Sequence, residues 1–181
     1  VINLLEGLMK IGLFLAYVWG ISFMPDIKRV FEYHGAEHKA INCLEAGHAL
    51  TVENVKKASR FHKRCGTSFI VFVLLISILL FSFFGKPPFL LRILYHLALL
   101  PLVAGISYEV IRLAGREDAP RVVHWLSLPG IWTQKITTQE PDASQIEVAI
   151  RSLEAVIAKD KALERVVTPL DPEQRTVREA I

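Results

Sequence analysis

Residues 34–66, HGAEHKAINCLEAGHALTVENVKKASRFHKRCG, form a polar stretch between long apolar runs and hold four of the six histidines and both cysteines. The stretch opens with an H-x-x-E-H motif at His34, Glu37 and His38, and it closes with an H-x-x-C motif at His62 and Cys65. On a helix, each motif places two ligand-type side chains about one turn apart. The stretch therefore predicts a metal site on a short water-facing unit of a membrane protein.

The same stretch has the pattern of a helical hairpin. Residues 34–46 read as one helix, because Gly47 is a usual residue just after a helix C-terminus. Thr51 is a suitable N-cap for a second helix over residues 52–63, with Gly66 as its stop. Such a hairpin is expected to bring its two far ends, and so the two motifs, close together.

Composition favours a membrane protein. The chain has 181 residues and is 52% hydrophobic, and its apolar residues gather in blocks rather than at spaced core positions. The net charge of +3 is too small to argue for a nucleic-acid partner, and two cysteines imply no disulfide framework. The chain begins at Val1 in mid-pattern, so we expect it to be a piece of a longer protein.

The apolar blocks predict an all-α integral membrane protein with two to three transmembrane helices. Residues 1–26 are expected to form a first membrane or interfacial helix, and residues 27–66 a cytoplasmic helical insert. Residues 67–113 read as a transmembrane hairpin around a Gly-Lys-Pro-Pro turn at 85–88. Its first arm, residues 67–84, contains no charge and is the clearest span.

The C-terminal part is expected to lie outside the membrane core. Residues 114–165 read as an interfacial segment followed by an amphipathic helix, and residues 166–181 as a flexible tail. The interfacial part, residues 119–136, is amphipathic, holds two tryptophans and looks too short and broken to span. Asp142 is expected to cap the helix, with Gln145 in the capping-box position.

Basic residues suggest the orientation. Eight of them lie between the first two apolar blocks, but the 85–88 turn offers only Lys86. The positive-inside rule then puts the insert and the C-terminal tail in the cytoplasm. The expected partners are the lipid bilayer and either a membrane protein or further copies of the chain.

The two motifs carry the chemistry. His34 and His38 share a helix face and suit one Zn²⁺, while Glu37 is placed to act as a general base, the catalytic role in H-x-x-E-H enzymes. His62 and Cys65 are the candidates to complete the shell. If both bind, the site is closed and structural; if one binds, a position stays open for catalysis. A pair of surface histidines without metal is the plain alternative.

Two further carboxylates are candidate additions to the site. Glu45 returns near the histidine face two turns away, where it either supports the ligands or is a solvated charge. Glu109 lies near the cytoplasmic end of the last span, where it either pairs locally with Arg112 or acts as a distant third ligand or a buried proton carrier. Cys43 reads as a packed helix residue. A cysteine nucleophile at Cys65 is a weaker alternative, because no orienting third group is identifiable.

The block RVFEYHGAEHKAINCLEAGHALTVENVKKASRFHKRCGTSF, together with LPG at 128–130 and TTQEPDASQIEVAI at 137–150, resembles the YqhQ-like family of bacterial membrane proteins. Members of that family have no known function and are described as predicted metal-dependent enzymes. The resemblance implies a multi-pass protein of the bacterial inner membrane. It carries over His34, Glu37, His38, His62 and Cys65 as site residues. It also implies a further N-terminal portion with a glycine-rich motif, which this sequence lacks.

Two functions follow as hypotheses. The first is a membrane-embedded zinc-dependent enzyme, hydrolytic in type, with its site on the cytoplasmic insert. The alternative is a non-enzymatic membrane factor, such as a complex subunit or a scaffold for membrane-protein biogenesis, with a structural metal or none.

Overall fold

The computed structural model describes residues 2–83, 87–116 and 119–167, and within these ranges every regular element is an α-helix. The helices are α1 (Ile2–Ile21), α2 (Pro25–Glu45), α3 (Val52–Lys57), α4 (Gly66–Ser82), α5 (Phe89–Ala114), α6 (Arg121–Thr137) and α7 (Ala143–Val167). The all-helical prediction is confirmed for this part of the chain. Residues 85–86 of the predicted turn and 168–181 of the predicted tail lie outside the described ranges.

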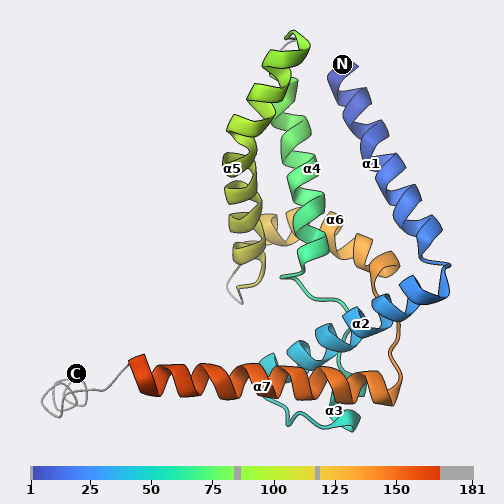
Figure 1. The fold of residues 1–181 in the computed structure, drawn as a ribbon, viewed down its shortest axis with the longest axis vertical. Helices are drawn as coiled ribbons and strands as arrows, with labels where there is room; N and C mark the ends of the chain where they lie inside the picture. Colours follow the sequence, from blue (N-terminus) through green and yellow to red (C-terminus); the bar gives the residue numbers. More distant parts are fainter. Residues whose placement is uncertain (1, 84–86, 117–118, 168–181) are drawn as a thin grey trace, which may run out of the picture.

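The helices fall into an upright group and a lower group (Figure 1). In the upright group, α4 packs against both α1 and α5, and α6 crosses beneath them. In the lower group, α2 and α7 lie along one another with α3 beside them. The two groups join where the chain bends by 101° between α1 and α2.

Within the described residues, α5 is the one helix that is by itself long and apolar enough to cross a membrane. Only 6% of its apolar 18-residue segment is buried. Helix α4 has 17 residues. It is therefore about 26 Å long, somewhat short of a hydrocarbon core of about 30 Å. Helices α1 and α2 qualify only together, as a bent pair. One candidate span is thus present among the described helices, and the crossing of a membrane by this or any further helix stays a prediction.

Helix α2 begins nine residues before the predicted start, at Pro25. Proline suits the first position of a helix, because its missing N–H would have no partner there. The predicted stop is confirmed: the helix ends at Glu45, and Gly47 has a φ of 74°, a left-handed conformation that glycine adopts freely.

Helix α3 begins as predicted, since the Thr51 side chain accepts a hydrogen bond from the Asn54 N–H at 3.3 Å. It ends at Lys57, so the predicted helix over 52–63 is wrong in its second half. The reason lies on α2, where Lys39 and Asn42 donate to backbone carbonyls of the following segment. These acceptors, at 2.7–3.1 Å, are the carbonyls of Lys56, Ala58, Ser59 and Phe61.

Because those carbonyls bond to α2, the chain after α3 runs beside α2 without forming a helix and enters α4 directly. Gly66, predicted as a stop, is instead the first residue of α4, and Cys65 is its N-cap. The route of this segment decides which of the predicted ligands meet.

The lower group has its own apolar core. Small residues of α2 let α7 approach closely, and Val55 of α3 closes one side. The buried members are Ala36, Ala40, Cys43, Val55, Ile146, Ala149 and Ile150. The predicted capping box of α7 is confirmed: the Gln145 N–H donates to the Asp142 carboxylate and the Asp142 N–H to the Gln145 side chain, both at 2.9 Å.

Candidate metal centre

Three of the predicted ligands converge. His34 and His38 lie one turn apart on α2, and Cys65 reaches them from the start of α4. One potential ligand atom from each lies within 4.8 Å of the other two. The Cys65 Sγ and the His34 Nε2 are 3.3 Å apart. Tetrahedral zinc with its usual bond lengths sets neighbouring N and S ligands about 3.5 Å apart, so this donor set fits the ion.

Both histidines are held in the tautomer that a metal needs. The Nδ1 of His34 lies 2.8 Å from the Thr137 carbonyl oxygen, and the Nδ1 of His38 lies 2.7 Å from the Arg60 carbonyl oxygen. A carbonyl oxygen only accepts, so each Nδ1 carries the proton and donates it. The Nε2 lone pair of each neutral ring is then left for an ion, with the ring orientation fixed from behind.

Cys65 has the charge state of a ligand. Its burial works against ionisation, but hydrogen bonds from His34, His38 and Thr67 outweigh this effect and lower the pKa of the thiol to about 5. The hydrogen bond with Cys65 in turn raises the pKa of His34, against the opposing effect of burial. A metal ion binds the thiolate and the neutral imidazole, so any proton held between the two groups would be released when an ion binds.

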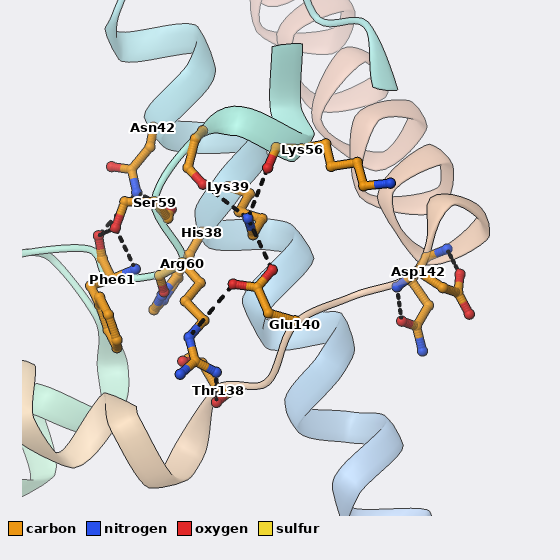
Figure 2. A network of polar contacts seen from close by, with 12 residues as sticks. His38, Lys39, Asn42, Lys56, Ser59, Arg60, Phe61, Thr138, Glu140 and Asp142 are labelled. Carbon is orange, nitrogen blue, oxygen red and sulfur yellow. Dashed lines mark hydrogen bonds and ion pairs between the residues drawn. The ribbon is translucent and has the colours of Figure 1, made fainter. Parts of the chain in front are cut away.

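The carbonyl that holds His38 belongs to a polar network, seen in Figure 2. The Arg60 guanidinium donates to the Thr138 carbonyl at 2.8 Å and lies 3.9 Å from the Glu140 carboxylate. Lys39, whose side chain is 6% exposed, forms the closer pair with Glu140, at 3.1 Å. These contacts tie the segment after α3 to the α6–α7 loop, and so fix both carbonyls that orient the histidines.

A buried glutamine holds the other side of the segment. The backbone N–H of His62 donates to the Gln134 Oε1 at 2.8 Å, and the Gln134 Nε2 donates to the His62 carbonyl at 2.7 Å and to the Ser68 Oγ at 3.0 Å. Gln134 is fully buried. It locks the segment to α6 and so sets where Cys65 enters the site.

His62 stands beside the donor group and outside it. Its ring centroid is 5.7 Å from that of His38, and its Nε2 lies 3.3 Å from the Glu45 carboxylate. Glu45 also accepts from Arg64. Since α3 ends before residue 62, the expected helical spacing of His62 and Cys65 does not arise. The donor group therefore contains Cys65 and leaves out His62, whose ring faces Glu45.

The two remaining carboxylates lie in different surroundings. Glu37 is exposed on α2 next to His38, and its negative charge is among the smaller effects that raise the pKa of His34. Glu109 pairs with Arg112 at 2.8 Å on the exposed side of α5. That local pair is the plainer of the two interpretations that the sequence left open.

Sequence reasoning missed the residues that hold the ligands in place. Lys39 and Gln134 carried a weak signal, since a lysine among the small residues of α2 and a glutamine between apolar residues of α6 are both unusual. Arg60 carried none. The carbonyls of Arg60 and Thr137 carried none, because every residue has one.

Comparisons with known proteins agree with the resemblance noted above. The profile of a family described as "Protein of unknown function (DUF1385)" matches residues 1–159. The chain is 45% identical over 154 residues to "Uncharacterized protein YqhQ" of Bacillus subtilis (strain 168). That match covers 84% of this chain and 48% of the relative, so the chain spans about half the relative's length. No solved structure matches.

Proposed function

The chain belongs to the DUF1385 family of proteins of unknown function, and we propose that it is a membrane-embedded, zinc-dependent hydrolytic enzyme. The observation that carries the proposal is the group of His34, His38 and Cys65, whose ligand atoms lie within 4.8 Å of one another. Two neutral imidazoles and a thiolate are a donor set that zinc prefers.

Three protein ligands leave the fourth coordination position of zinc open, and this is why we assign catalysis to the site. His62, the residue best placed to close the site, bonds to Glu45 instead. A zinc ion held by His34, His38 and Cys65 would supply Lewis-acid activation of water. Glu37, exposed beside His38, is the chain's candidate general base. The carbonyls of Thr137 and Arg60 keep the imidazoles oriented throughout.

The proposed location is the bacterial inner membrane, with the metal centre on its cytoplasmic side. Helix α5 supports the membrane placement by its length and apolar composition. The excess of Lys and Arg between α1 and α4, at the end of the molecule that carries the metal centre, supports the orientation. Helices α1 and α4 are proposed to complete the membrane part beside α5.

A second candidate function is a non-enzymatic membrane factor in which the metal staples α2 to the start of α4. The observation that favours it is the 5.7 Å between the ring centroids of His62 and His38. A rotation of the His62 side chain away from Glu45 would supply a fourth ligand and close the site.

Cobalt substitution separates the two candidates. Cobalt(II) takes zinc's place and reports its ligands through visible absorption. An open site predicts that His62→Ala leaves the spectrum unchanged and that an added small anion changes it. A closed site predicts the reverse: a changed spectrum in His62→Ala and no response of the wild type to the anion.

The base role of Glu37 is tested by Glu37→Gln. We expect the wild type to hydrolyse chromogenic ester or phosphoester probes in a metal-dependent way. The variant should keep its metal and lose this activity. Glu53→Gln, on the exposed face of α3, is a matched control and should retain both. Loss of metal from Glu37→Gln would contradict the base role.

A further inference from the structure

Helix α6 is polar on its buried side. The described residues of α6 that are fully buried are all small or polar: Ser127, Gly130, Thr133, Gln134 and Thr137. Gly130 is required here, since a Cβ at this position would lie 2.7 Å from the Ser68 Cβ. Every polar side chain of this face has a hydrogen bond or other partner. The Thr133 and Thr137 hydroxyls donate to carbonyls of α6 itself, and Gln134 makes the polar contacts across to His62 and Ser68.

The outer side of α6 is apolar. Trp125 and Trp132 are seven residues apart, which places them within about 20° of each other around the helix. Their side chains are 72% and 60% exposed, and the neighbouring Val122 and Leu126 are 69% and 54% exposed. A helix packed on a water-soluble protein shows the opposite pattern, with apolar residues inside and polar residues outside. Polar contacts inside and apolar side chains outside are what helices in lipid show.

This outer face continues the apolar surface of the neighbouring helices. Helix α6 packs against α5 and α1, and it lies across the lower end of the upright group (Figure 1). On α5, Leu97, Leu100 and Leu102 are more than half exposed, as are Trp19 and Phe23 at the end of α1 and just beyond it. Exposed cations stand near the two ends of α6, Arg121 at its first residue and Lys135 in its last turn.

We infer that α6 lies in the plane of the bilayer, with its Trp125–Trp132 face immersed at the boundary between acyl chains and headgroups. The occupant of this face is membrane lipid, and the flanking cations favour anionic headgroups. Tryptophan at this depth keeps its ring in apolar surroundings and its N–H near polar ones. Because the Thr137 carbonyl at the end of α6 holds His34, the candidate metal centre then sits at the membrane surface.

Fluorescence quenching tests the inference directly, because the chain has three tryptophans, Trp19, Trp125 and Trp132. Proteins that keep only Trp125 or only Trp132, with the other two replaced by Phe, are placed in vesicles of phosphatidylglycerol and phosphatidylcholine. Spin-labelled lipids then quench from within the bilayer, and acrylamide quenches from water. We expect strong lipid quenching, at a depth of roughly 5–10 Å below the surface, and weak acrylamide quenching. The unmodified protein should behave likewise, which covers the case of a variant that misfolds.

Two engineered tryptophans in a Trp-free background supply the reference points. Leu97→Trp, 64% exposed in the first half of α5, should be reached by lipid, and Lys57→Trp, 70% exposed on α3, should be reached by acrylamide. This inference rests on the membrane placement in the proposed function, and these references separate the two.

If Leu97→Trp responds to lipid while Trp125 and Trp132 respond to acrylamide, the inference about α6 is wrong and the membrane placement stands. If Trp125 and Trp132 are shielded from both quenchers, a second copy of the chain covers the face, which also overturns the inference. If even Leu97→Trp responds only to acrylamide, the membrane placement fails and takes this inference with it.

Discussion

Gly35 lies where the α6–α7 loop crosses α2, and Gly35→Ala should damage both the fold and the metal centre. A Cβ at this position would lie 2.1 Å from the Gln139 carbonyl oxygen, and real Cβ atoms essentially never come within 3.0 Å of another atom. The loop would have to move by about 1 Å to restore that separation. That movement strains the hydrogen bond at 2.9 Å from the Gln139 N–H to the Phe31 carbonyl.

The energetic terms can be compared. Overpacking a tight contact costs about 1–3 kcal/mol, and loss of the hydrogen bond adds about 1 kcal/mol. The better helix propensity of alanine returns about 1 kcal/mol. The expected net destabilisation is therefore about 1–3 kcal/mol. Because the Thr137 carbonyl that orients His34 lies two residues before Gln139, zinc affinity should also fall, by roughly 10- to 100-fold.

The assay pairs thermal unfolding of the detergent-solubilised protein with a zinc titration against a chromophoric chelator. Gly20→Ala is the matched control, since Gly20 is also helical and no heavy atom lies within 4 Å of the place that a Cβ would take there. The control should unfold at an equal or slightly higher temperature and bind zinc normally. A Gly35→Ala protein as stable and as zinc-competent as Gly20→Ala would refute the close approach of the loop to α2.

Three further outcomes are expected. Lys39→Met removes the hydrogen-bond donor to the Lys56 and Ala58 carbonyls and should cost about 2–3 kcal/mol of stability in chemical denaturation. The control Lys57→Met removes an exposed ion pair with Glu53 and should change the stability by less than about 0.5 kcal/mol. Gln134→Leu leaves the His62 N–H and C=O without their partner and should cost about 2–4 kcal/mol in the same assay, with no loss contradicting the clamp. In metal-free protein, the stability contributed by the lowered pKa of Cys65 is complete above the unfolded pKa of about 8.5 and is lost as the pH falls through about 5. The raised pKa of His34 works in the other direction, contributing stability below about 6.5 that is lost as the pH rises through its folded pKa. Melting temperatures of the wild type and of Cys65→Ser, measured against pH, should therefore differ most between about pH 5 and the folded pKa of His34. A difference that stays constant with pH would contradict the interaction between Cys65 and His34.

Local signals in the sequence were dependable. The capping box of α7 needs only Asp142 and Gln145, and the end of α2 needs only Gly47 in a left-handed conformation. His34 and His38 share a face because they are four residues apart on one helix. The Glu109–Arg112 pair is equally local.

Features that depend on distant partners were beyond the sequence. The residues after Lys57 have a helical pattern, but Lys39 and Asn42 of α2 take the carbonyls that a helix would use. That competition is decided by tertiary contact, and it is why Cys65 approaches His34 while His62 faces Glu45. The amphipathic pattern of residues 119–136 predicted an interfacial segment, but it did not say which side of α6 would be buried against the protein.

Both proposed functions depend on one metal ion held by His34, His38 and Cys65. The first measurement is the metal content of the purified protein by elemental mass spectrometry, beside a His34→Ala/His38→Ala double variant and Cys65→Ser. We expect close to one equivalent of zinc in the wild type, lost in the double variant and strongly reduced in Cys65→Ser. No bound metal in the wild type, or equal metal in all three proteins, would contradict it.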